Sequence, residues 1–219
     1  MSDAPGLEKI RMRNSILLGL LFVAVIWLVM LIEWVSGTDL GYLGIYPLKW
    51  SGLIGVLLAP LLHADAAHAG ANSIPLFVGV AIIFYFYREV AWQVIFLIWI
   101  ITGLWVWTMA RESYHIGASG IVYGYISFLF FSGIFRRNLR LMAVSLLMVF
   151  LYGGLLWGIF PDFFPNRRVS WESHLMGALA GLVIAVFYRK KGLQREKYSF
   201  EEEEEDDEDD NGIPWRTEG

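Results

Sequence analysis

The chain of 219 residues has no cysteine, which removes several kinds of chemistry at once. Disulfide bonds, thiol nucleophiles and iron–sulfur clusters are excluded, because each depends on cysteine sulfur. The absence indicates nothing about the redox compartment in which the protein works, since a chain without thiols is compatible with an oxidising or a reducing one.

Charged side chains are also scarce, except in one terminal run. They make up 17% of the chain, whereas 57% is hydrophobic and the mean hydropathy is +0.53. Residues 201–210 are ten consecutive acids, so the net charge of −4 averages two different parts of the chain. Before position 201, sixteen Lys and Arg outnumber ten Asp and Glu. The sequence therefore predicts a basic, apolar domain followed by an acidic tail that is disordered from about residue 193.

Long apolar runs fill the basic domain. A helix needs about 20 residues at ~1.5 Å each to cross the hydrocarbon core of a bilayer. The first run extends from Ser15 to Val35. It exceeds the ~7–15 apolar residues of a signal peptide, and no small-residue cleavage pattern follows it. Further candidate spans are expected at 69–87, 91–110, 117–135, 141–160 and 174–188. The apolar segment Leu53–Leu62 is too short to span and is expected to be interfacial or re-entrant.

These runs predict an all-α membrane protein with six transmembrane helices. The expected parts are an N-terminal cytoplasmic segment at 1–14, a six-helix membrane domain at 15–192 and an acidic cytoplasmic tail at 193–219. With the N-terminus inside, twelve Lys and Arg fall on the cytoplasmic side and four on the outer side. This bias agrees with the positive-inside rule and places both termini in the cytoplasm. We expect the plasma membrane of a bacterium.

Polar side chains from three distant segments are expected at the same membrane depth. His68 and Asn72, Ser119, and His174 each lie near the outer end of a different candidate span. Ionisable and polar residues inside membranes are costly and rare, so each of them is a functional hypothesis. Their convergence is an independent indication, because the topology was derived only from apolar runs and Lys/Arg positions.

Ser119 lies in the sequence Gly117-Ala118-Ser119-Gly120, at the start of an apolar span. Glycines let the backbone approach closely and adopt tight turns. A serine hydroxyl becomes an effective nucleophile when a neighbouring base takes its proton. Serine and glycine are also common where membrane helices pack, so packing is the alternative interpretation.

His174 supplies the base that this chemistry needs. A neutral imidazole can accept the serine proton and later deliver it to the leaving amine. Gly177 and Gly181 follow on the same helix face, where small residues allow a second helix to approach closely. If that helix is the span of Ser119, the two side chains meet. The alternative is a histidine at a hydrated helix end with no partner.

Three further side chains are candidates for supporting roles. His68 and Asn72 are four residues apart, so they share one helix face and can both donate hydrogen bonds to a developing oxyanion. They could equally anchor the preceding loop. Tyr123 lies on the same face as Ser119 and is a candidate to pack on His174 or to fill the core.

No acidic residue is an obvious third catalytic member. The nearest acids lie outside the predicted spans: Asp39, Asp65, Asp162 and Glu172. We therefore expect a Ser–His dyad, with the histidine oriented by packing and not by a buried carboxylate.

These residues resemble the pattern of the rhomboid family of intramembrane serine proteases, over roughly residues 15–190. The matching elements are His63, His68 and Asn72 as H-x4-H-x3-N, Gly117-Ala118-Ser119-Gly120 with Tyr123, and His174-x2-Gly177-x3-Gly181. Each motif is weak alone, and their order, spacing and helix assignment together are specific.

The resemblance implies a six-helix rhomboid-like bundle and a serine endopeptidase that needs no metal or cofactor. It implies Ser119 as nucleophile, His174 as base, and an oxyanion site formed by His68, Asn72 and the backbone N–H of Ser119. It also implies a structural role for His63 in the first outer loop. Supporting roles fall to Tyr123, Gly117, Gly120, Gly177 and Gly181.

One departure from the family pattern concerns the first outer loop. Many members carry a Trp-Arg pair there, whereas the nearest candidate here is Trp50 followed by Ser51. The missing arginine puts the internal bonding of this loop in question and leaves the catalytic set intact.

The leading hypothesis is cleavage of single-span transmembrane substrates near the outer membrane face. A non-catalytic relative that binds membrane helices as a chaperone is the alternative, although both Ser119 and His174 are present. A metal site from His63, Asp65, His68 and His174 is disfavoured, because the spacing of His63 and His68 does not suit one helix face. Membrane lipid is an expected partner and nucleic acid is not. The acidic tail is expected to be a solvated extension, with docking of a cytoplasmic partner as the alternative.

Overall fold

The computed structural model describes residues 5–137, 139–151 and 170–191. Within these residues the regular structure is helical, apart from an isolated antiparallel bridge between Ile45 and His115. The longer helices are α1 (Pro5–Ser36), α3 (Ala66–Phe86), α4 (Ala91–Met109), α5 (Ser119–Phe135), α6 (Leu139–Leu151) and α8 (Trp171–Phe187). Shorter turns of helix form η1 (Gly41–Leu43), η2 (Trp50–Ile54), α2 (Gly55–Leu58) and η3 (Ala59–Leu61).

Three helices are long and apolar enough to cross a membrane: α1, α3 and α4. The helices α5 and α8 are also apolar but have 17 residues each, and the described part of α6 has 13. The fold is therefore that of an all-α membrane protein, and the count of six spans stays a prediction. The second half of the expected span 141–160 and the expected tail lie outside the described residues.

The first helix begins ten residues earlier than the apolar run that predicted it. It starts at Pro5, and proline suits the first helical turn because its missing N–H has no intrahelical acceptor there. Lys9, Arg11 and Arg13 are good helix formers, so the helix continues through them. An apolar run marks where lipid contact is favourable, whereas the helix itself extends into the charged segment.

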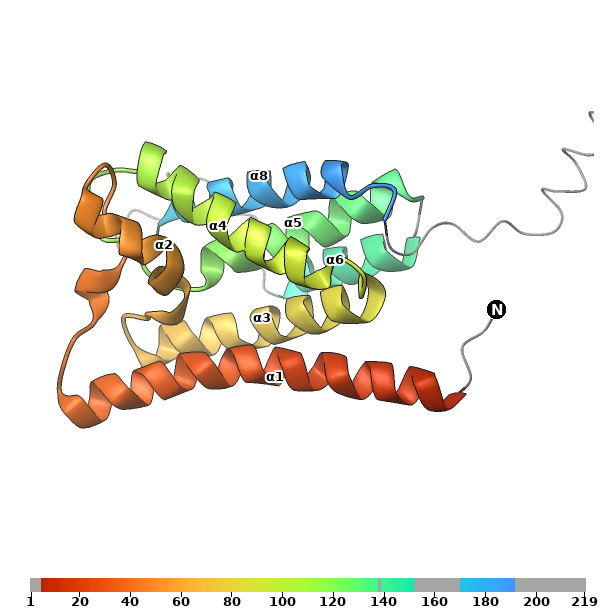
Figure 1. The fold of residues 1–219 in the computed structure, drawn as a ribbon, viewed down its shortest axis with the longest axis horizontal. Coiled ribbons are helices and arrows are strands. Elements are labelled where there is room, and N and C mark those ends of the chain that lie inside the picture. The colour runs from red at the N-terminus through yellow and green to blue at the C-terminus, as the bar shows by residue number, and fades with distance from the viewer. Residues whose placement is uncertain (1–4, 138, 152–169, 192–219) are drawn as a thin grey trace, which may run out of the picture.

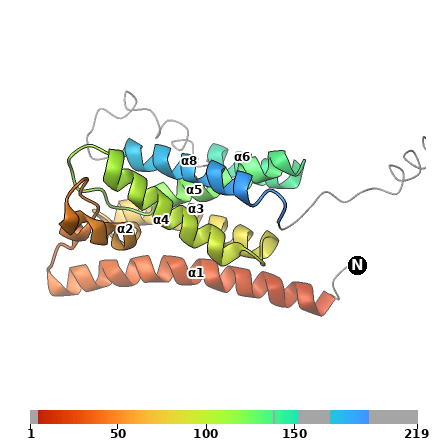
Figure 2. The same cartoon turned by 45° about the horizontal axis from the view of Figure 1, so that its top comes forward.

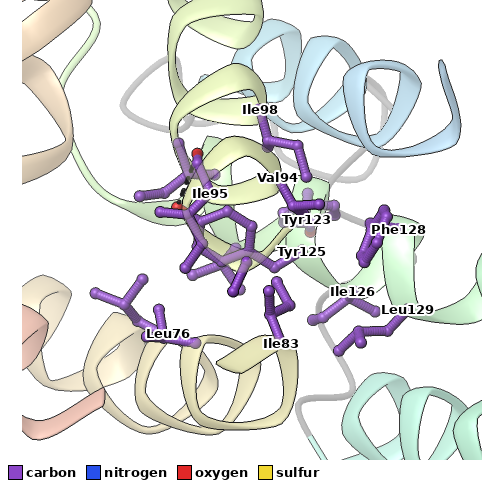
Figure 3. Close-up of a cluster of buried hydrophobic side chains, with 14 of the residues drawn as sticks. Leu76, Ile83, Val94, Ile95, Ile98, Tyr123, Tyr125, Ile126, Phe128 and Leu129 are labelled. Carbon is purple, nitrogen blue, oxygen red and sulfur yellow. Dashed lines mark hydrogen bonds between the residues drawn. The ribbon is translucent and has the colours of Figure 1, made fainter. Parts of the chain in front are cut away.

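The helix α5 lies in the middle of the bundle. It carries buried aromatic and aliphatic side chains on several faces, including Tyr125, Phe128 and Leu129, each with an exposed fraction of 0%. Figure 3 shows these side chains meeting Leu76 and Ile83 of α3 on one side and Ile95 and Ile98 of α4 on another. A helix that is apolar all round must be enclosed by its neighbours, and α5 is.

The helices α5 and α8 form the most extensive helix pair. A Cβ atom at Gly177 would lie 1.9 Å from the carbonyl oxygen of Gly120, and one at Gly181 would lie 2.1 Å from that of Gly124. The two backbones are therefore in direct contact along the glycine face of α8. This is the packing that the spacing of Gly177 and Gly181 predicted.

The helices alternate in direction, so polar groups from several elements gather at one end. Figure 1 shows the N-terminus and the end of α8 at one end of the bundle, with the starts of α3, α5 and α8 at the other. In both Figure 1 and Figure 2, α1 lies at the edge of the bundle beside α3. The alternation is the arrangement expected of consecutive spans, and it places Ser119 and His174 at the same end.

Candidate active site

Ser119 and His174 are hydrogen-bonded. The distance between His174 Nε2 and Ser119 Oγ is 2.8 Å, and each residue lies in the first turns of its helix. Ser119 is half-buried, whereas His174 is buried with an exposed fraction of 7%. The close contact of α5 and α8 brings the two helix starts together, so the glycine packing accounts for the pair.

Tyr123 stacks on the imidazole of His174. The ring centroids are 4.2 Å apart and the planes differ by 10°. Tyr123 follows Ser119 by one helical turn, which places its ring beside the serine on the same face of α5. The stack restrains rotation of the histidine ring and holds Nε2 towards the hydroxyl.

His68 and Asn72 face the backbone that leads into α5. A Cβ atom at Gly117 would lie 2.7 Å from His68 Cε1 and 3.8 Å from Asn72 Nδ2. Gly117 also has a φ of +109°, a backbone conformation that residues with a side chain rarely adopt. Glycine is therefore required at this position for two reasons, and the approach of α3 to the residues before Ser119 depends on it.

The side-chain amide of Asn72 carries a hydrogen-bond donor for which the described residues provide no acceptor. Its Nδ2 atom is buried and has no hydrogen-bond partner among the described residues. A buried donor without an acceptor costs about 1–3 kcal/mol, and such groups call for an explanation. An oxygen that is bound only during a reaction would supply the acceptor.

His63 supports the loop that carries Ser119. The backbone N–H of Ala118 donates to His63 Nε2 over 3.3 Å, and the His63 ring meets the His68 ring edge-on at 4.9 Å. Burial, together with the nearby His68, lowers the pKa of His63 to about 4. The ring is therefore neutral at ordinary pH, as an acceptor from Ala118 must be.

A polar cluster that the sequence did not predict joins the loop before α5 to the start of α8. His115 Nδ1 lies 2.6 Å from Ser170 Oγ, and Ser170 caps α8 through Ser173 N–H. Burial lowers the pKa of His115. Its Nε2 lies 3.0 Å from the carbonyl oxygen of Arg111. His115 appeared in the sequence only as one of four histidines, with no motif to mark its role.

The buried acid nearest to His174 in sequence is engaged elsewhere. Arg111 Nη1 donates to both carboxylate oxygens of Glu172 at 3.0 Å, and the Glu172 side chain is only 6% exposed. The pair crosses from the end of α4 to the first turn of α8. A carboxylate also suits that position because the N-terminus of a helix favours negative charge.

The loop between α1 and α3 is held without the arginine of the family pattern. Leu48 N–H donates to the Trp107 carbonyl at 3.0 Å, and Trp107 Nε1 donates to the Lys49 carbonyl at 2.9 Å. Within the loop, a Cβ atom at Gly52 would lie 2.2 Å from the Tyr46 carbonyl oxygen. Hydrogen bonds to Trp107 of α4 and close packing at Gly52 therefore stabilise this loop, in which Trp50-Ser51 stands in place of the Trp-Arg pair.

The arrangement suits acyl transfer better than metal chemistry. In the described part of the chain, no three His, Asp or Glu side chains are grouped as a metal site requires. Instead a serine meets a histidine base, and two possible donors face the residues just before that serine. Peptide hydrolysis by a serine nucleophile requires groups of these types close together: a hydroxyl, a basic imidazole and hydrogen-bond donors.

Comparison with known proteins identifies the family. The model of the Rhomboid domain matches residues 50–191. A Mycobacterium tuberculosis protein described as uncharacterized is 42% identical over 173 residues, which are 76% of this chain and 72% of that protein. An uncharacterized Mycobacterium leprae protein is 36% identical over 173 residues, covering 76% and 68%.

A more distant relative carries the family in its name. A protein of Acanthamoeba polyphaga mimivirus, provisionally named a rhomboid protein, is 28% identical over 149 residues, which are 63% of this chain and 77% of that protein. No solved structure gives a significant match. The family model spans well over half of the chain and includes Ser119, His174, His68 and Asn72. The chain belongs to the rhomboid family.

Proposed function

We propose that this protein is an intramembrane serine endopeptidase that hydrolyses peptide bonds of transmembrane-helix substrates by a Ser–His dyad. The observation that carries the proposal is the 2.8 Å contact between His174 Nε2 and Ser119 Oγ, made by residues 55 positions apart. Membership of a family of intramembrane serine proteases supports it. The Tyr123 stack and the unpaired Asn72 donor add support, because a merely structural serine would need neither.

The reaction begins when Ser119 Oγ attacks the scissile carbonyl carbon and His174 Nε2 takes the hydroxyl proton. The carbonyl oxygen becomes an oxyanion, which accepts hydrogen bonds from Asn72 Nδ2, His68 and the backbone N–H of Ser119. Each such donor commonly contributes ~3–4 kcal/mol to lowering the barrier. The intermediate collapses as His174 protonates the leaving amine, and water then hydrolyses the acyl-enzyme by the reverse sequence of proton transfers.

The membrane arrangement that suits this chemistry has six spans, formed by α1, α3, α4, α5, α6 and α8. Both termini are cytoplasmic, so the dyad faces the outer side of a bacterial plasma membrane. The membrane domain covers 15–192, preceded by a short cytoplasmic segment and followed by the acidic tail. A basic cytoplasmic protein is the partner whose charge the tail would fit.

The substrate class follows from the expected position of Ser119 and His174 near the outer ends of membrane-spanning helices. A helix hides its carbonyl groups in hydrogen bonds, so a substrate must unwind locally before Ser119 reaches a peptide bond. The proposed substrates are single-span membrane proteins with small residues at the cleaved bond and helix-weakening residues beyond it.

A fluorophosphonate probe tests the nucleophile. Purified wild-type protein should be labelled, whereas Ser119→Ala and His174→Ala should not, and the same variants should fail to cleave a model substrate in liposomes. Ser127→Ala is a matched control on α5, because Ser127 Oγ donates to the Ala178 carbonyl and lies two turns beyond the dyad. It should be labelled like the wild type.

The outcome also separates the protease from a non-catalytic relative. Equal labelling of the wild type and Ser119→Ala would remove Ser119 as nucleophile. Firm binding of a helical client by the wild type, without cleavage in detergent or liposomes, would support a membrane-helix chaperone instead.

A further inference from the structure

A cavity lies at the end of the bundle opposite Ser119 and His174. It has a volume of about 390 Å³ and lies between the first turns of α1 and the junction of α3 with α4. Figure 1 shows this end of α1 at the N-terminus, far from the starts of α5 and α8. The proposed reaction uses none of the residues that line this cavity.

Two arginines give the cavity its charge. Arg11 of α1 and Arg88, which follows α3, both line it, although they are 77 positions apart. Asn14 adds an amide donor. Among the described lining residues there is no carboxylate, and the nearby Glu8 accepts a hydrogen bond from the Tyr85 hydroxyl at 3.1 Å. The fold therefore concentrates positive charge and hydrogen-bond donors at one point.

The remaining walls are apolar and open to the surroundings of the bundle. Leu7, Ile10 and Trp92 line the cavity and have exposed fractions of 60%, 48% and 47%. Trp92 packs edge-on against Phe84, another lining residue, at 4.8 Å between ring centroids. Tryptophan is enriched at membrane–water interfaces, so this end of the bundle has the composition of an interfacial layer.

We propose that this cavity binds the phosphate headgroup of an anionic phospholipid of the leaflet at the N-terminal end of the bundle. Arg11, Arg88 and Asn14 bind the phosphate oxygens, and the acyl chains lie along the exposed apolar side chains around the cavity. Basic pockets between spanning helices are suited to anionic lipid headgroups, and arginine binds phosphate through several N–H donors. The cavity suits a lipid better than a free anion, because α1 and the junction of α3 with α4 bring both basic and apolar side chains to it.

Native mass spectrometry of the purified protein tests the site, with titration by phosphatidylglycerol or phosphatidylcholine of the same acyl chains. The wild type should bind one phosphatidylglycerol in preference to phosphatidylcholine. Arg11→Gln/Arg88→Gln should weaken phosphatidylglycerol binding on the order of thirtyfold, the effect of two cations near an anionic headgroup.

A matched control removes the same charge outside the cavity. Lys9 and Arg13 lie on the same turns of α1, are exposed and do not line the cavity. Lys9→Gln/Arg13→Gln should therefore bind phosphatidylglycerol like the wild type. An equal loss in both double variants would overturn the proposal in favour of non-specific attraction.

Two further measurements keep the proposal testable if the arginine variant does not fold. Asn14→Trp fills the cavity from an exposed position and keeps both arginines, so it should also weaken phosphatidylglycerol binding; unchanged binding would overturn the proposal. Inorganic phosphate at 10 mM, on the order of a typical buffer concentration, should not displace the lipid, since it lacks the apolar contacts. Displacement by phosphate would identify a free-anion site instead. None of these measurements depends on proteolytic activity, so their outcome is separate from that of the proposed function.

Discussion

At the scale of single residues, the candidate site depends on which side chains share a helix face. The i, i+4 relation of Ser119 to Tyr123 and of His68 to Asn72 needs only a helix. The contact of His174 with Ser119 additionally needs two helices to meet. Gly177 and Gly181 indicated which face of α8 meets a second helix, but not the distance between His174 and Ser119. Sequence spacing alone left open whether Tyr123 packs on His174, and the structure places the rings in a stack.

Protonation of His63 offers a test at the same scale. Its folded-state pKa of about 4 lies below the usual value of 6.5, so the unfolded chain binds the extra proton more readily. His63 should therefore destabilise the fold as the pH falls from about 6.5 towards 4, by at most ~1.4 kcal/mol per pH unit. Above pH 6.5 its contribution should be constant.

Thermal unfolding in detergent between pH 7 and pH 4.5 measures this effect. The midpoint of the wild type should fall across that range, and His63→Gln should show a shallower fall because glutamine does not titrate. His115 has a lowered pKa from burial as well, so part of the slope should persist in the variant. Identical slopes for both proteins would show that His63 does not titrate in this way.

At the scale of helices, the contact of α5 with α8 positions the dyad. Gly177→Ala adds a methyl group that would lie 1.9 Å from the Gly120 carbonyl oxygen, so the helices must separate. Overpacking of this kind costs about 1–3 kcal/mol. We expect a lower unfolding temperature and a loss of probe labelling at Ser119, because the hydrogen bond to His174 lengthens.

Gly70→Ala is the matched control for this prediction. Gly70 is also in a candidate span, but a Cβ atom there meets nothing within 4 Å. Alanine is the better helix former by about 1 kcal/mol, so the control should be as stable as the wild type or slightly more so. Unimpaired labelling of Gly177→Ala would contradict the role assigned to the helix contact.

The ion pair Arg111–Glu172 connects the end of α4 to the first turn of α8, the helix that carries His174. Arg111→Ala leaves the Glu172 carboxylate buried without this partner, which is costly for a charge in a site of low polarity. Because the Arg111 side chain is 34% exposed, solvent screens part of the loss, and we expect a destabilisation of about 1–2 kcal/mol.

A double-mutant cycle isolates this pair. Arg111→Ala/Glu172→Ala should be less destabilised than the sum of the single variants, measured by chemical or thermal unfolding in detergent. Additive effects would mean that the two side chains do not interact in solution. Retained activity in Arg111→Ala at a temperature where it is folded would limit the pair to a role in stability.

Helix positions could be predicted from the sequence more readily than helix ends. Apolar runs located α3, α4 and α5 to within a few residues, because hydrocarbon contact requires the run. They missed the first ten residues of α1, where charged side chains leave the apolar pattern but continue the helix. The cluster around His115 and Arg111 was also missed, since contacts between loops and helix ends follow no period in the sequence.

For the whole molecule, the absence of cysteine makes the proposed topology directly testable. Single cysteines placed at exposed positions report which side of the membrane each segment faces. Thr38 follows α1 and Glu112 follows α4, so cysteines there lie at the end that carries the dyad. Glu89 follows α3 and Lys190 follows α8, so cysteines there lie at the opposite end, beside the proposed lipid cavity.

In intact cells, a membrane-impermeant maleimide should label Thr38→Cys and Glu112→Cys and should label Glu89→Cys and Lys190→Cys only after permeabilisation. The reason is the excess of Lys and Arg at the N-terminal end, since positively charged segments are retained in the cytoplasm. The cysteine-free parent provides the background. The reverse pattern would place the dyad on the cytoplasmic side and would require substrates to be cut at their inner ends. A mixed pattern, in which Lys190→Cys is labelled in intact cells and Glu89→Cys is not, would mean an odd number of spans between these two positions. The six-helix membrane domain has four there, so this pattern would exclude it.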